Sequence, residues 1–390
     1  MASPPACPVW HNCRYRTGWE VHASSLPRSP PNKKMIVSQT PLRISFAGGA
    51  TDFARYYREH EGLVVSAAID KYIYVIVSPR FDDLIYVSYS KKEIVQKVSD
   101  LQHELVREAL VRTGIQAAVE ITMLADVPSE GSGLGSSSSL VVGLLHALYG
   151  YKGELVTAEQ LAREACEIEI ELCGKPIGKQ DQYIAAYGGI CEFRFRKDDS
   201  VGVRRFQRRP ELFHNLSSQI LLFYTGRTRK SAAILAVQDG RTEINVKQLH
   251  SLKALAGRTG EALDRGRLWE LGRVLHDGWT LKRELADGIS NPEIEEMYQK
   301  ALAAGALGGK ICGAGGGGFL LLYCHPAHQQ AVRKALEDYR ELPISVEPDG
   351  SKIIFQQRRV GHQLVECPVE LEVASLAGEQ QRNAANSFEP

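Results

Sequence analysis

The sequence contains no apolar run long enough to cross a membrane. In its 390 residues the longest apolar stretches, such as 140–145, fall far short of the roughly 20 residues of a spanning helix. A formal charge of +1 gives no broad attraction for nucleic acid or anionic membranes, so any anion must be bound by a local site. The eight cysteines include no CxxC pair, which indicates reduced thiols. We therefore expect a cytoplasmic protein that binds neither nucleic acid nor membranes.

Residues 1–34 differ in composition from the rest of the chain. They hold six prolines and two of the four tryptophans, with no periodic apolar pattern and no continuous apolar stretch typical of a signal peptide. We interpret them as a disordered leader, or as an extension upstream of a start at Met35. They are left out of the fold prediction.

From Met35 on, the pattern predicts an α+β protein with a first domain at 35–208. Runs of β-branched and aromatic residues indicate strands, and apolar residues at helical spacing indicate helices. The strands are expected at 36–46, 63–69, 72–77, 84–89 and 117–124, and the helices at 53–60, 101–113, 140–149 and 157–173. The helix at 140–149 has no polar face and should be buried. Thr157 is expected to cap the last helix and Gly174 to end it.

A basic stretch at 194–209 is expected to form a hairpin or a linker to a second domain at 209–360. There, strands are expected at 219–224, 310–312, 319–323 and 352–356, and helices at 231–237, 267–285, 292–304 and 327–339. Strands interleaved with helix pairs are typical of an α+β domain. Residues 361–390 are assigned to a tail.

The segment with the clearest chemistry is the Gly/Ser-rich loop Pro128–Ser139, between an expected strand and the buried helix. Glycines let the backbone approach a ligand closely, and the N-terminus of the following helix supplies unpaired amides. A flexible linker is the alternative, but a linker would not run directly into a buried helix. The spacing is neither that of a Walker A loop nor that of a Rossmann fingerprint. We therefore predict a phosphate-binding loop without a lysine.

Charged residues lie near glycines in two further segments. Arg43 falls within the first expected strand and Asp52 just beyond its glycine turn, where they could neutralise a reacting oxygen and bind sugar hydroxyls. Arg43 could instead pair with a structural acid. Asp181 opens a short helix and could simply cap it. Upstream lie three alternate glutamates, Glu167, Glu169 and Glu171. Glu167 and Glu171 are four residues apart and share a helix face, whereas Glu169 points elsewhere.

Five glycines lie between Gly313 and Gly318, in an expected turn between two strands. A hairpin needs one or two glycines, so this number predicts close approach of the backbone to another loop or to a ligand. Cys324, His325 and His328 are too few to predict a metal site.

These segments, in this order, resemble the GHMP kinases, the superfamily of galactokinase, homoserine kinase and mevalonate kinases. The matching motifs are a PxRxxxxGxxTD-like segment, a PxxxxGLGSS loop, an acidic segment ending near DQ and a C-terminal glycine-rich strand pair, over about 36–356. The resemblance implies the two-domain fold of that superfamily: an N-terminal mixed sheet with helices and a C-terminal ferredoxin-like α/β sandwich. It also implies a sugar kinase that uses ATP and Mg²⁺.

Carried over by position, the resemblance assigns roles to individual residues. Asp181 would be the catalytic aspartate, and Arg43 the cation beside the reacting hydroxyl. Ser137 and Glu169 would hold the metal, with Glu171 as the alternative to Glu169. The nucleotide would be bound by Gly131, Gly133, Leu134, Gly135, Ser136, Ser137 and Ser138, and the sugar by Gly48, Gly49, Asp52, Lys175, Lys179, Gln180, Arg229 and Gly315.

Within the superfamily, four strings are similar to those of the D-glycero-D-manno-heptose 7-phosphate kinases, which phosphorylate the anomeric hydroxyl: PLRISFAGGATDF, SGLGSSSSL, GKQDQY and YTGRTRKSA. Gly49 and Ala50 stand where galactokinases have Glu-His, which argues against galactose. A substrate that already carries a phosphate needs further cations. The candidates are Lys175, Lys179, Arg227, Arg229 and Lys230.

Three alternatives stay open at this stage. Fucokinase-like enzymes share the FAGG turn and the QDQ string. A catalytically silent sensor would bind ATP and a sugar to control a partner, and an ATP-dependent decarboxylase of the mevalonate branch would act on small branched acids. We expect a monomer or a homodimer, with a small-molecule sugar phosphate as its binding partner.

Overall fold

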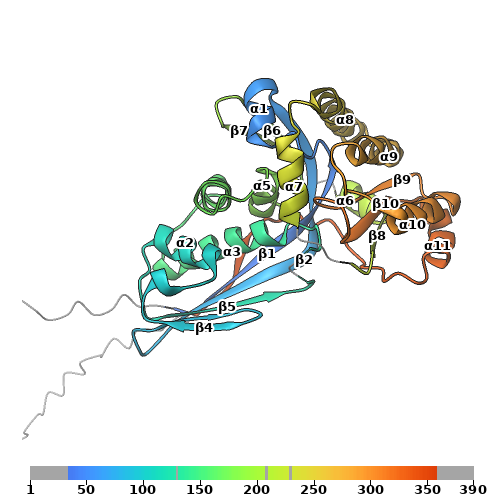
Figure 1. Ribbon diagram of the computed structural model, residues 1–390. Coiled ribbons are helices and arrows are strands. Elements are labelled where there is room, and N and C mark those ends of the chain that lie inside the picture. Colours follow the sequence, from blue (N-terminus) through green and yellow to red (C-terminus); the bar gives the residue numbers. More distant parts are fainter. Residues whose placement is uncertain (1–33, 129–130, 207–209, 228–230, 358–390) are drawn as a thin grey trace, which may run out of the picture. The chain divides into compact units, whose positions relative to one another are not determined.

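The computed structural model describes residues 34–128, 131–206, 210–227 and 231–357 (Figure 1). In these residues the chain forms a mixed sheet and a three-stranded antiparallel sheet, both accompanied by helices. The mixed sheet has the order β11-β1-β2-β5-β3-β4, and β6 pairs with β2 and with β7. The predicted α+β class is confirmed.

The strands of the mixed sheet are β1 (Ile36–Ala47), β2 (Gly62–Pro79), β3 (Ile85–Ser88), β4 (Lys92–Val95), β5 (Val119–Ala125), β6 (Ile190–Phe195), β7 (Val201–Arg205) and β11 (Lys352–Gln356). β3 and β5 run parallel, whereas β1, β2 and β5 pair in antiparallel order. β6 and β7 form a hairpin, which confirms one of the two structures expected for the basic stretch.

Two expectations about strands were wrong. The segments expected as separate strands at 63–69 and 72–77 form the single strand β2, because a β-bulge opposite Pro41 absorbs the polar pair Asp70-Lys71 without a turn. The segment at 352–356 was expected in the second domain, but it pairs with β1 and extends the mixed sheet. Pairing between such distant segments is not visible in a local pattern.

Seven helical segments accompany the mixed sheet: α1 (Ala54–His60), η1 (Val98–Asp100), α2 (Glu104–Thr113), α3 (Ser136–Lys152), α4 (Ala158–Cys166), η2 (Glu167–Leu172) and α5 (Gln180–Tyr187). As predicted, the Thr157 side chain caps α4 by accepting a hydrogen bond from the Gln160 amide. The single helix expected at 157–173 instead changes to a π-helical turn at Glu167. Such a turn inserts an extra residue and is often found at functional sites.

Helix α3 is apolar on all sides and packs against β1 and β2. The contact is close, because Ser38 Oγ donates a hydrogen bond to the Gly143 carbonyl. At the start of α3, the amide of Arg43 donates to the Leu134 carbonyl over 3.0 Å. The core therefore places the Gly/Ser loop directly beside the middle of β1.

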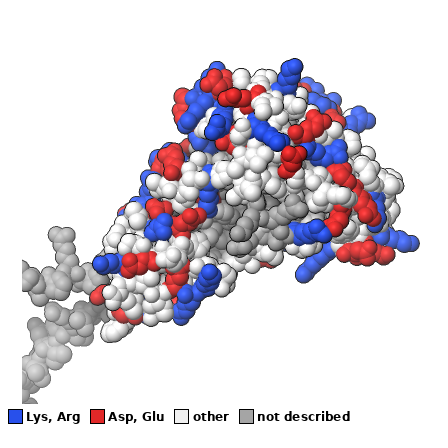
Figure 2. Space-filling model, viewed as in Figure 1, with Lys and Arg blue, Asp and Glu red and all other residues white. Residues whose placement is uncertain are grey.

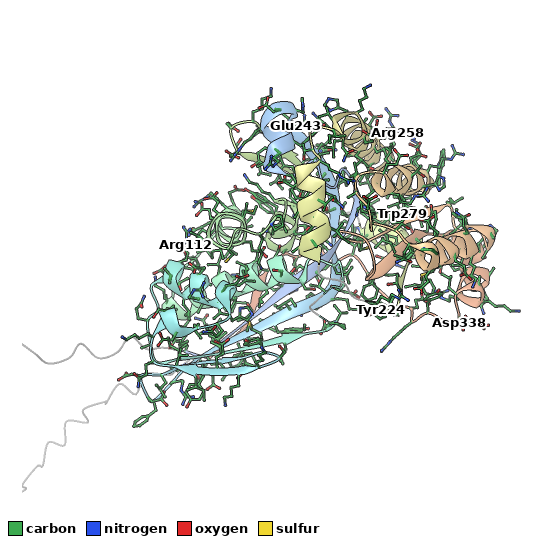
Figure 3. The ribbon with its side chains drawn as sticks, viewed as in Figure 1. Arg112, Tyr224, Glu243, Arg258, Trp279 and Asp338 are labelled. Atoms are coloured by element: carbon green, nitrogen blue, oxygen red, sulfur yellow. The ribbon has the colours of Figure 1, made fainter. Side chains whose placement is uncertain are left out.

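The three-stranded sheet consists of β8 (Ile220–Tyr224), β9 (Gly308–Ile311) and β10 (Phe319–Tyr323), and an isolated bridge joins Phe223 to Glu341. Its part of the chain contains α6 (Pro210–Ser217), α7 (Ser231–Gly240), α8 (Val246–Asp264), α9 (Trp269–Arg283), α10 (Pro292–Ala303) and α11 (Pro326–Ala335). The sequence did not predict α8. Helix α9 packs on β9, and its Trp279 is fully buried (Figure 3).

The surface agrees with the small net charge. Basic and acidic side chains are interspersed over the face seen in Figure 2. Among the described helices, none is long and apolar enough to cross a membrane. The five cysteines in the described part of the chain are free thiols.

Candidate active site

Arg43 and Asp181 form a bidentate ion pair, with Arg43 Nε 2.7 Å from Asp181 Oδ1 and a terminal nitrogen 2.6 Å from Oδ2. The other terminal nitrogen of Arg43, Nη1, donates to the Gly133 carbonyl over 2.5 Å. Burial lowers the pKa of Arg43, but the charge of Asp181 and its hydrogen bond, together with smaller effects of Cys312 and Asp52, outweigh this and the net shift is upward. The pair therefore joins the first strand, the short helix α5 and the glycine loop at one point.

Asp181 does not act as the N-cap of α5. The cap position belongs to Lys179, and the Asp181 side chain points to Arg43 instead. The acid that pairs with Arg43 is thus the predicted catalytic aspartate. About a fifth of the Asp181 side chain is exposed, so a ligand can still reach its carboxylate.

The two glycine-rich loops pack backbone against backbone. A Cβ atom on Gly133 would lie 2.4 Å from the Cys312 carbonyl oxygen, and one on Gly313 would lie 2.6 Å from Gly133 Cα. A Cβ atom on Gly318 would lie 2.5 Å from the Ser132 carbonyl oxygen. Approach of the second glycine turn to another loop is confirmed, and that loop is the predicted phosphate-binding one.

The serines that open α3 lie in different environments. Ser136 and Ser138 are buried, whereas Ser137 is exposed at the surface of the loop. The Ser137 and Ser138 hydroxyls donate to the two oxygens of Glu169 over 2.5 and 2.6 Å. Leu134 is fully buried, so its side chain anchors the loop.

Glu169 is fully buried within the π-helical turn, whereas Glu171 is exposed. Gln182 donates a further hydrogen bond to Glu169, over 2.7 Å. Lys175 Nζ lies 3.1 Å from Ser137 Oγ and 3.5 Å from Glu169. The phosphate-binding loop therefore has a lysine beside it after all, supplied by a different segment.

The site offers a suitable set of ligands for magnesium. Mg²⁺ is usually held by one or two carboxylates together with substrate phosphates and water. Glu169 supplies such a carboxylate, and the Ser137 hydroxyl lies against it. In the described residues no cluster of three or more His, Cys, Asp or Glu side chains forms a complete metal site by itself.

Asp52 lies at the start of α5, the helix that carries Asp181. It is 2% exposed and accepts hydrogen bonds from the amides of Ala50 and Gln180, each over 3.1 Å. Burial raises the pKa of Asp52 to about 6, the amide of Gln180 opposes this shift, and the charge of Asp181 adds to it. A Cβ atom on Gly178 would lie 2.0 Å from the Asp52 carboxylate, so glycine is needed there.

The glycines assigned to the sugar are of two kinds. Gly48 makes a tight contact with the backbone of β2, and Gly315 packs against Ile289. At Gly49 a Cβ atom would lie 3.7 Å from the Gln180 side chain, an ordinary contact, so the fold does not require glycine there. Gly131, which was assigned to the nucleotide rather than to the sugar, has the positive φ of 70° that favours glycine.

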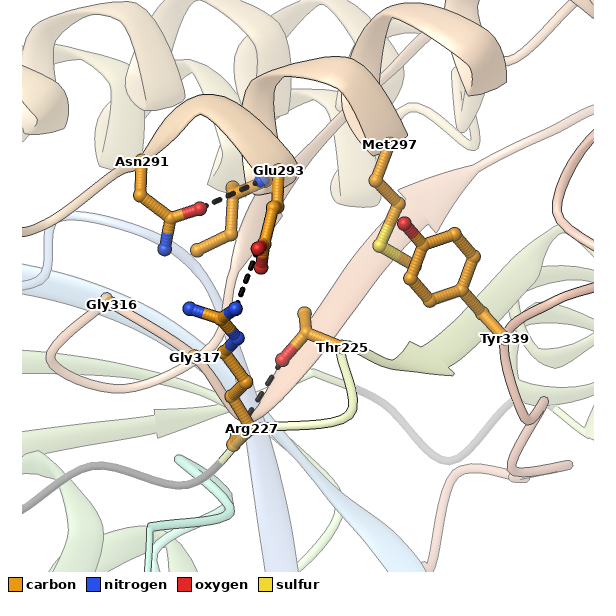
Figure 4. A pocket seen from close by; sticks show the side chains of 9 residues that line it. Thr225, Arg227, Asn291, Glu293, Met297, Gly316, Gly317 and Tyr339 are labelled. Atoms are coloured by element: carbon orange, nitrogen blue, oxygen red, sulfur yellow. Dashed lines mark hydrogen bonds and ion pairs between the residues drawn. The ribbon is translucent and has the colours of Figure 1, made fainter.

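The cations proposed for a substrate phosphate are already engaged where the structure describes them. Lys179 pairs with Asp199, at 3.5 Å, and its ammonium lies over the ring of Tyr57. Arg227 pairs with Glu293 at 2.5 Å, at the mouth of a small pocket beside the glycine turn (Figure 4). Arg229 and Lys230 lie outside the described residues.

Four polar side chains near the site were missed from the sequence. Ser45 Oγ is buried without a hydrogen-bond partner in the described structure, two residues along β1 from Arg43. Lys282 donates to the Gly313 carbonyl, Lys310 is 7% exposed, and Gln182 holds Glu169. For Ser45 the alternation of β1 was a usable signal, whereas Lys282 comes from a helix far away in the sequence.

Comparisons with known proteins agree with this geometry. Residues 94–189 match the model of the GHMP kinases N terminal domain, and residues 261–341 match that of the GHMP kinases C terminal. A D-glycero-alpha-D-manno-heptose 7-phosphate kinase from Campylobacter jejuni is 32% identical over 317 residues, which are 78% of this chain and 93% of that protein.

Two further proteins are similar over most of this chain. An L-fucokinase/L-fucose-1-P guanylyltransferase from Bacteroides fragilis is 28% identical over 78% of this chain, which is 36% of that protein. The crystal structure of a D-glycero-D-manno-heptose 1-phosphate kinase from Bacteroides thetaiotaomicron is similar with a TM-score of 0.68 and 26% identity. The structural match covers 83% of this chain and 99% of the chain in that crystal structure. The chain therefore belongs to the GHMP kinases, and it is a sugar kinase that transfers a phosphoryl group from ATP to an alcohol.

Proposed function

We propose that this kinase phosphorylates the anomeric hydroxyl of D-glycero-D-manno-heptose 7-phosphate, in the cytoplasm, for the synthesis of nucleotide-activated heptose. The observation that carries the proposal is the Arg43–Asp181 pair, which contacts the phosphate loop through the Gly133 carbonyl. The similarity to a heptose 7-phosphate kinase across most of both chains supports this choice of sugar.

On the donor side, the loop amides and the N-terminus of α3 would bind the phosphates of ATP. Lys175 adds a positive charge next to Ser137. Ser137 and Glu169 would hold Mg²⁺, which would neutralise charge on the β- and γ-phosphates when bound. Glu169 rather than Glu171 is our choice, because only Glu169 faces the loop.

On the acceptor side, Asp181 would orient the sugar hydroxyl and take its proton as the hydroxyl oxygen bonds to the γ-phosphorus and the bond from that phosphorus to the leaving ADP oxygen breaks. Phosphoryl transfer passes through a loose transition state, so positioning and charge neutralisation count for more than deprotonation. Arg43 fixes the Asp181 carboxylate through two hydrogen bonds and places a positive charge beside the reacting oxygen. Asp52 and Gln180 would bind other hydroxyls of the sugar.

A fucokinase-like activity is the second candidate, and one observation favours it. Lys179 and Arg227 are both neutralised by acidic partners. A neutral sugar would need no further cation, whereas a sugar phosphate needs one. A catalytically silent sensor would not need the Arg43–Asp181 pair, and detectable ATP turnover would exclude it.

The test is ATP consumption with heptose 7-phosphate, heptose 1-phosphate, free heptose, fucose and galactose, followed by phosphorus NMR of each product. We expect the highest kcat/KM with heptose 7-phosphate, a new anomeric phosphate, and weaker activity as salt rises. Equal or better kcat/KM with fucose would support the second candidate. Release of carbon dioxide from a small branched acid would identify a decarboxylase instead.

A further inference from the structure

Two lysines of the second half of the chain lie at the catalytic centre without an acidic partner in the described structure. Lys310 is on β9 and is 7% exposed, and no hydrogen bond of its ammonium is found among the described residues. Lys282 is near the end of α9 and donates its hydrogen bond to the Gly313 carbonyl. A carbonyl oxygen leaves the charge of an ammonium uncompensated.

Backbone contacts connect these lysines to the phosphate-binding loop. Gly313, which accepts the bond from Lys282, lies against Gly133, and the Gly133 carbonyl in turn accepts from Arg43. Helix α9 packs against both β9 and β1, the strand that carries Arg43. The two ammonium groups therefore belong to the same region as the loop and the Arg43–Asp181 pair.

Leaving two such charges without a counterion is unfavourable. Burial of an ammonium costs several kcal/mol unless a partner compensates for it. Burial lowers the pKa of Lys310 to about 8, and burial together with the charge of Lys310 lowers that of Lys282. The neighbouring Cys312 cannot compensate, because burial raises the pKa of its thiol and keeps it neutral.

The nearby carboxylates do not compensate for them either. Asp181 is engaged by Arg43 on both oxygens, and Asp52 is held by backbone amides. With all groups ionised, Arg43 and the two lysines outnumber these two carboxylates by one positive charge. The negative charge of a bound phosphate would compensate for this excess, and its oxygens would accept hydrogen bonds from both ammonium groups.

We infer that Lys282 and Lys310 form a phosphate-binding subsite at the catalytic centre. The identity of the bound phosphate rests on the proposed function. It is either the phosphate that the acceptor sugar already carries or the phosphoryl group in transit from ATP. The subsite would supply the positive charge for a phosphate that Lys179 and Arg227 do not offer, because acidic partners neutralise both of them.

The binding test uses the enzyme saturated with ADP, so that the nucleotide loop is occupied, and inorganic phosphate as the probe. At ten times its Kd, phosphate should raise the melting temperature of the wild type by about 2–4 °C. The shift should be lost in Lys310→Met and in Lys282→Met. It should persist in the control Lys253→Met, since Lys253 donates to the His60 carbonyl away from the site.

A second readout separates a ligand site from a structural role. Without phosphate, Lys310→Met should melt at or above the wild-type temperature, because methionine removes a buried charge. A lysine that only stabilises the fold would give the opposite result. Lys282 is partly exposed, so Lys282→Met tests the subsite even if Lys310→Met does not fold.

Kinetics identify the source of the phosphate. If the lysines bind the phosphate of the acceptor, the variants should raise KM for heptose 7-phosphate about tenfold or more and leave KM for free heptose unchanged. If they bind the phosphoryl group in transit, kcat should fall by a similar factor with both acceptors. Unchanged kinetics together with an unchanged phosphate shift would overturn the subsite. Absence of turnover with every sugar in the wild type would overturn the proposed function but not the phosphate-binding result.

Discussion

The two sides of the catalytic centre treat their charged groups in opposite ways. On the side of the mixed sheet, each charged group has a partner: Arg43 with Asp181, Asp52 with backbone amides, and Glu169 with two serines and a glutamine. On the side of the three-stranded sheet, Lys282 and Lys310 have no acidic partner in the described residues. The charged groups of the first side are compensated without a ligand, and those of the second side are not.

The two sides therefore suit different tasks: the first suits positioning of a hydroxyl, and the second suits binding of an anion. Internal hydrogen bonds hold the carboxylates in fixed positions before any substrate arrives, which favours accurate positioning of a hydroxyl. Unpaired cations gain most when an anion binds, because its charge compensates for the hydration that they lost on burial. The following predictions test this comparison, beginning with the largest expected effect.

Asp181→Asn should lower kcat by roughly a hundred- to ten-thousand-fold, because the amide cannot accept the hydroxyl proton. The fold and ATP binding should persist, since the amide oxygen can still accept one of the two hydrogen bonds from Arg43. Steady-state kinetics and a nucleotide-binding titration check both expectations. Wild-type turnover in this variant would refute the assignment of Asp181 as the catalytic aspartate. It would also refute the positioning role of the mixed-sheet side.

Gly133→Ala should lower kcat by on the order of ten- to a hundredfold, since its Cβ would collide with Cys312 and displace the loop. Gly153→Ala is the matched control. Both glycines have positive φ, 74° and 80°, but Gly153 has no atom within 4 Å of the added Cβ. The control should lose about 1–2 kcal/mol of stability from backbone strain and keep its activity. Equal kinetic losses in both variants would show that contact between the loops is unimportant.

Ser137→Ala and Glu169→Gln should each raise the magnesium concentration needed for half-maximal rate, by on the order of tenfold or more. Glu171→Gln is the control, because Glu171 is exposed and should leave the requirement unchanged. A magnesium titration at fixed ATP measures the effect. If only Glu171→Gln shifts the requirement, the assignment of Glu169 is wrong.

Asp52 should make acceptor binding depend on pH near 6. Folding raises its pKa from 3.8 to about 6, so between these values only the folded chain holds the proton, and this contribution to stability falls as pH rises. Above pH 6 the carboxylate is charged and accepts hydrogen bonds from sugar hydroxyls, so KM for the acceptor should rise several-fold below pH 6. Sugar phosphates titrate in the same range, and Asp52→Asn is therefore the control. An unchanged KM profile in that variant would remove Asp52 from the sugar site.

Deletion of residues 1–34 should have the smallest effect. Their composition shows no apolar pattern that would pack, so melting temperature and kcat/KM should stay within error of the full chain. A drop of several degrees, or a clear loss of activity, would show that this segment contributes to the fold or to one side of the site.

Local signals explain why much of the fold was predictable. Thr157 was recognisable as a cap, and the apolar helix around 140–149 as a buried element, because both patterns depend on neighbouring residues. The register of β2 across Asp70 was not predictable, since it depends on a bulge opposite Pro41. The π-helical turn that faces Glu169 towards the loop was missed for a similar reason, because helical spacing assumes regular turns.

The sequence by itself determined the family and the parts of the site that lie in continuous motifs: the glycine loop, Arg43 with Asp52, and Asp181. Short spacings constrain backbone conformation and the chemistry of neighbouring side chains, so these parts could be recognised. Only the tertiary structure decided which charges meet. It paired Arg43 with Asp181, placed Lys175 beside Ser137, and brought Lys282 and Lys310 to the same centre. Whether a cation is neutralised or left for a ligand depends on contacts between distant segments, and those contacts arise when the two sheets and their helices pack together.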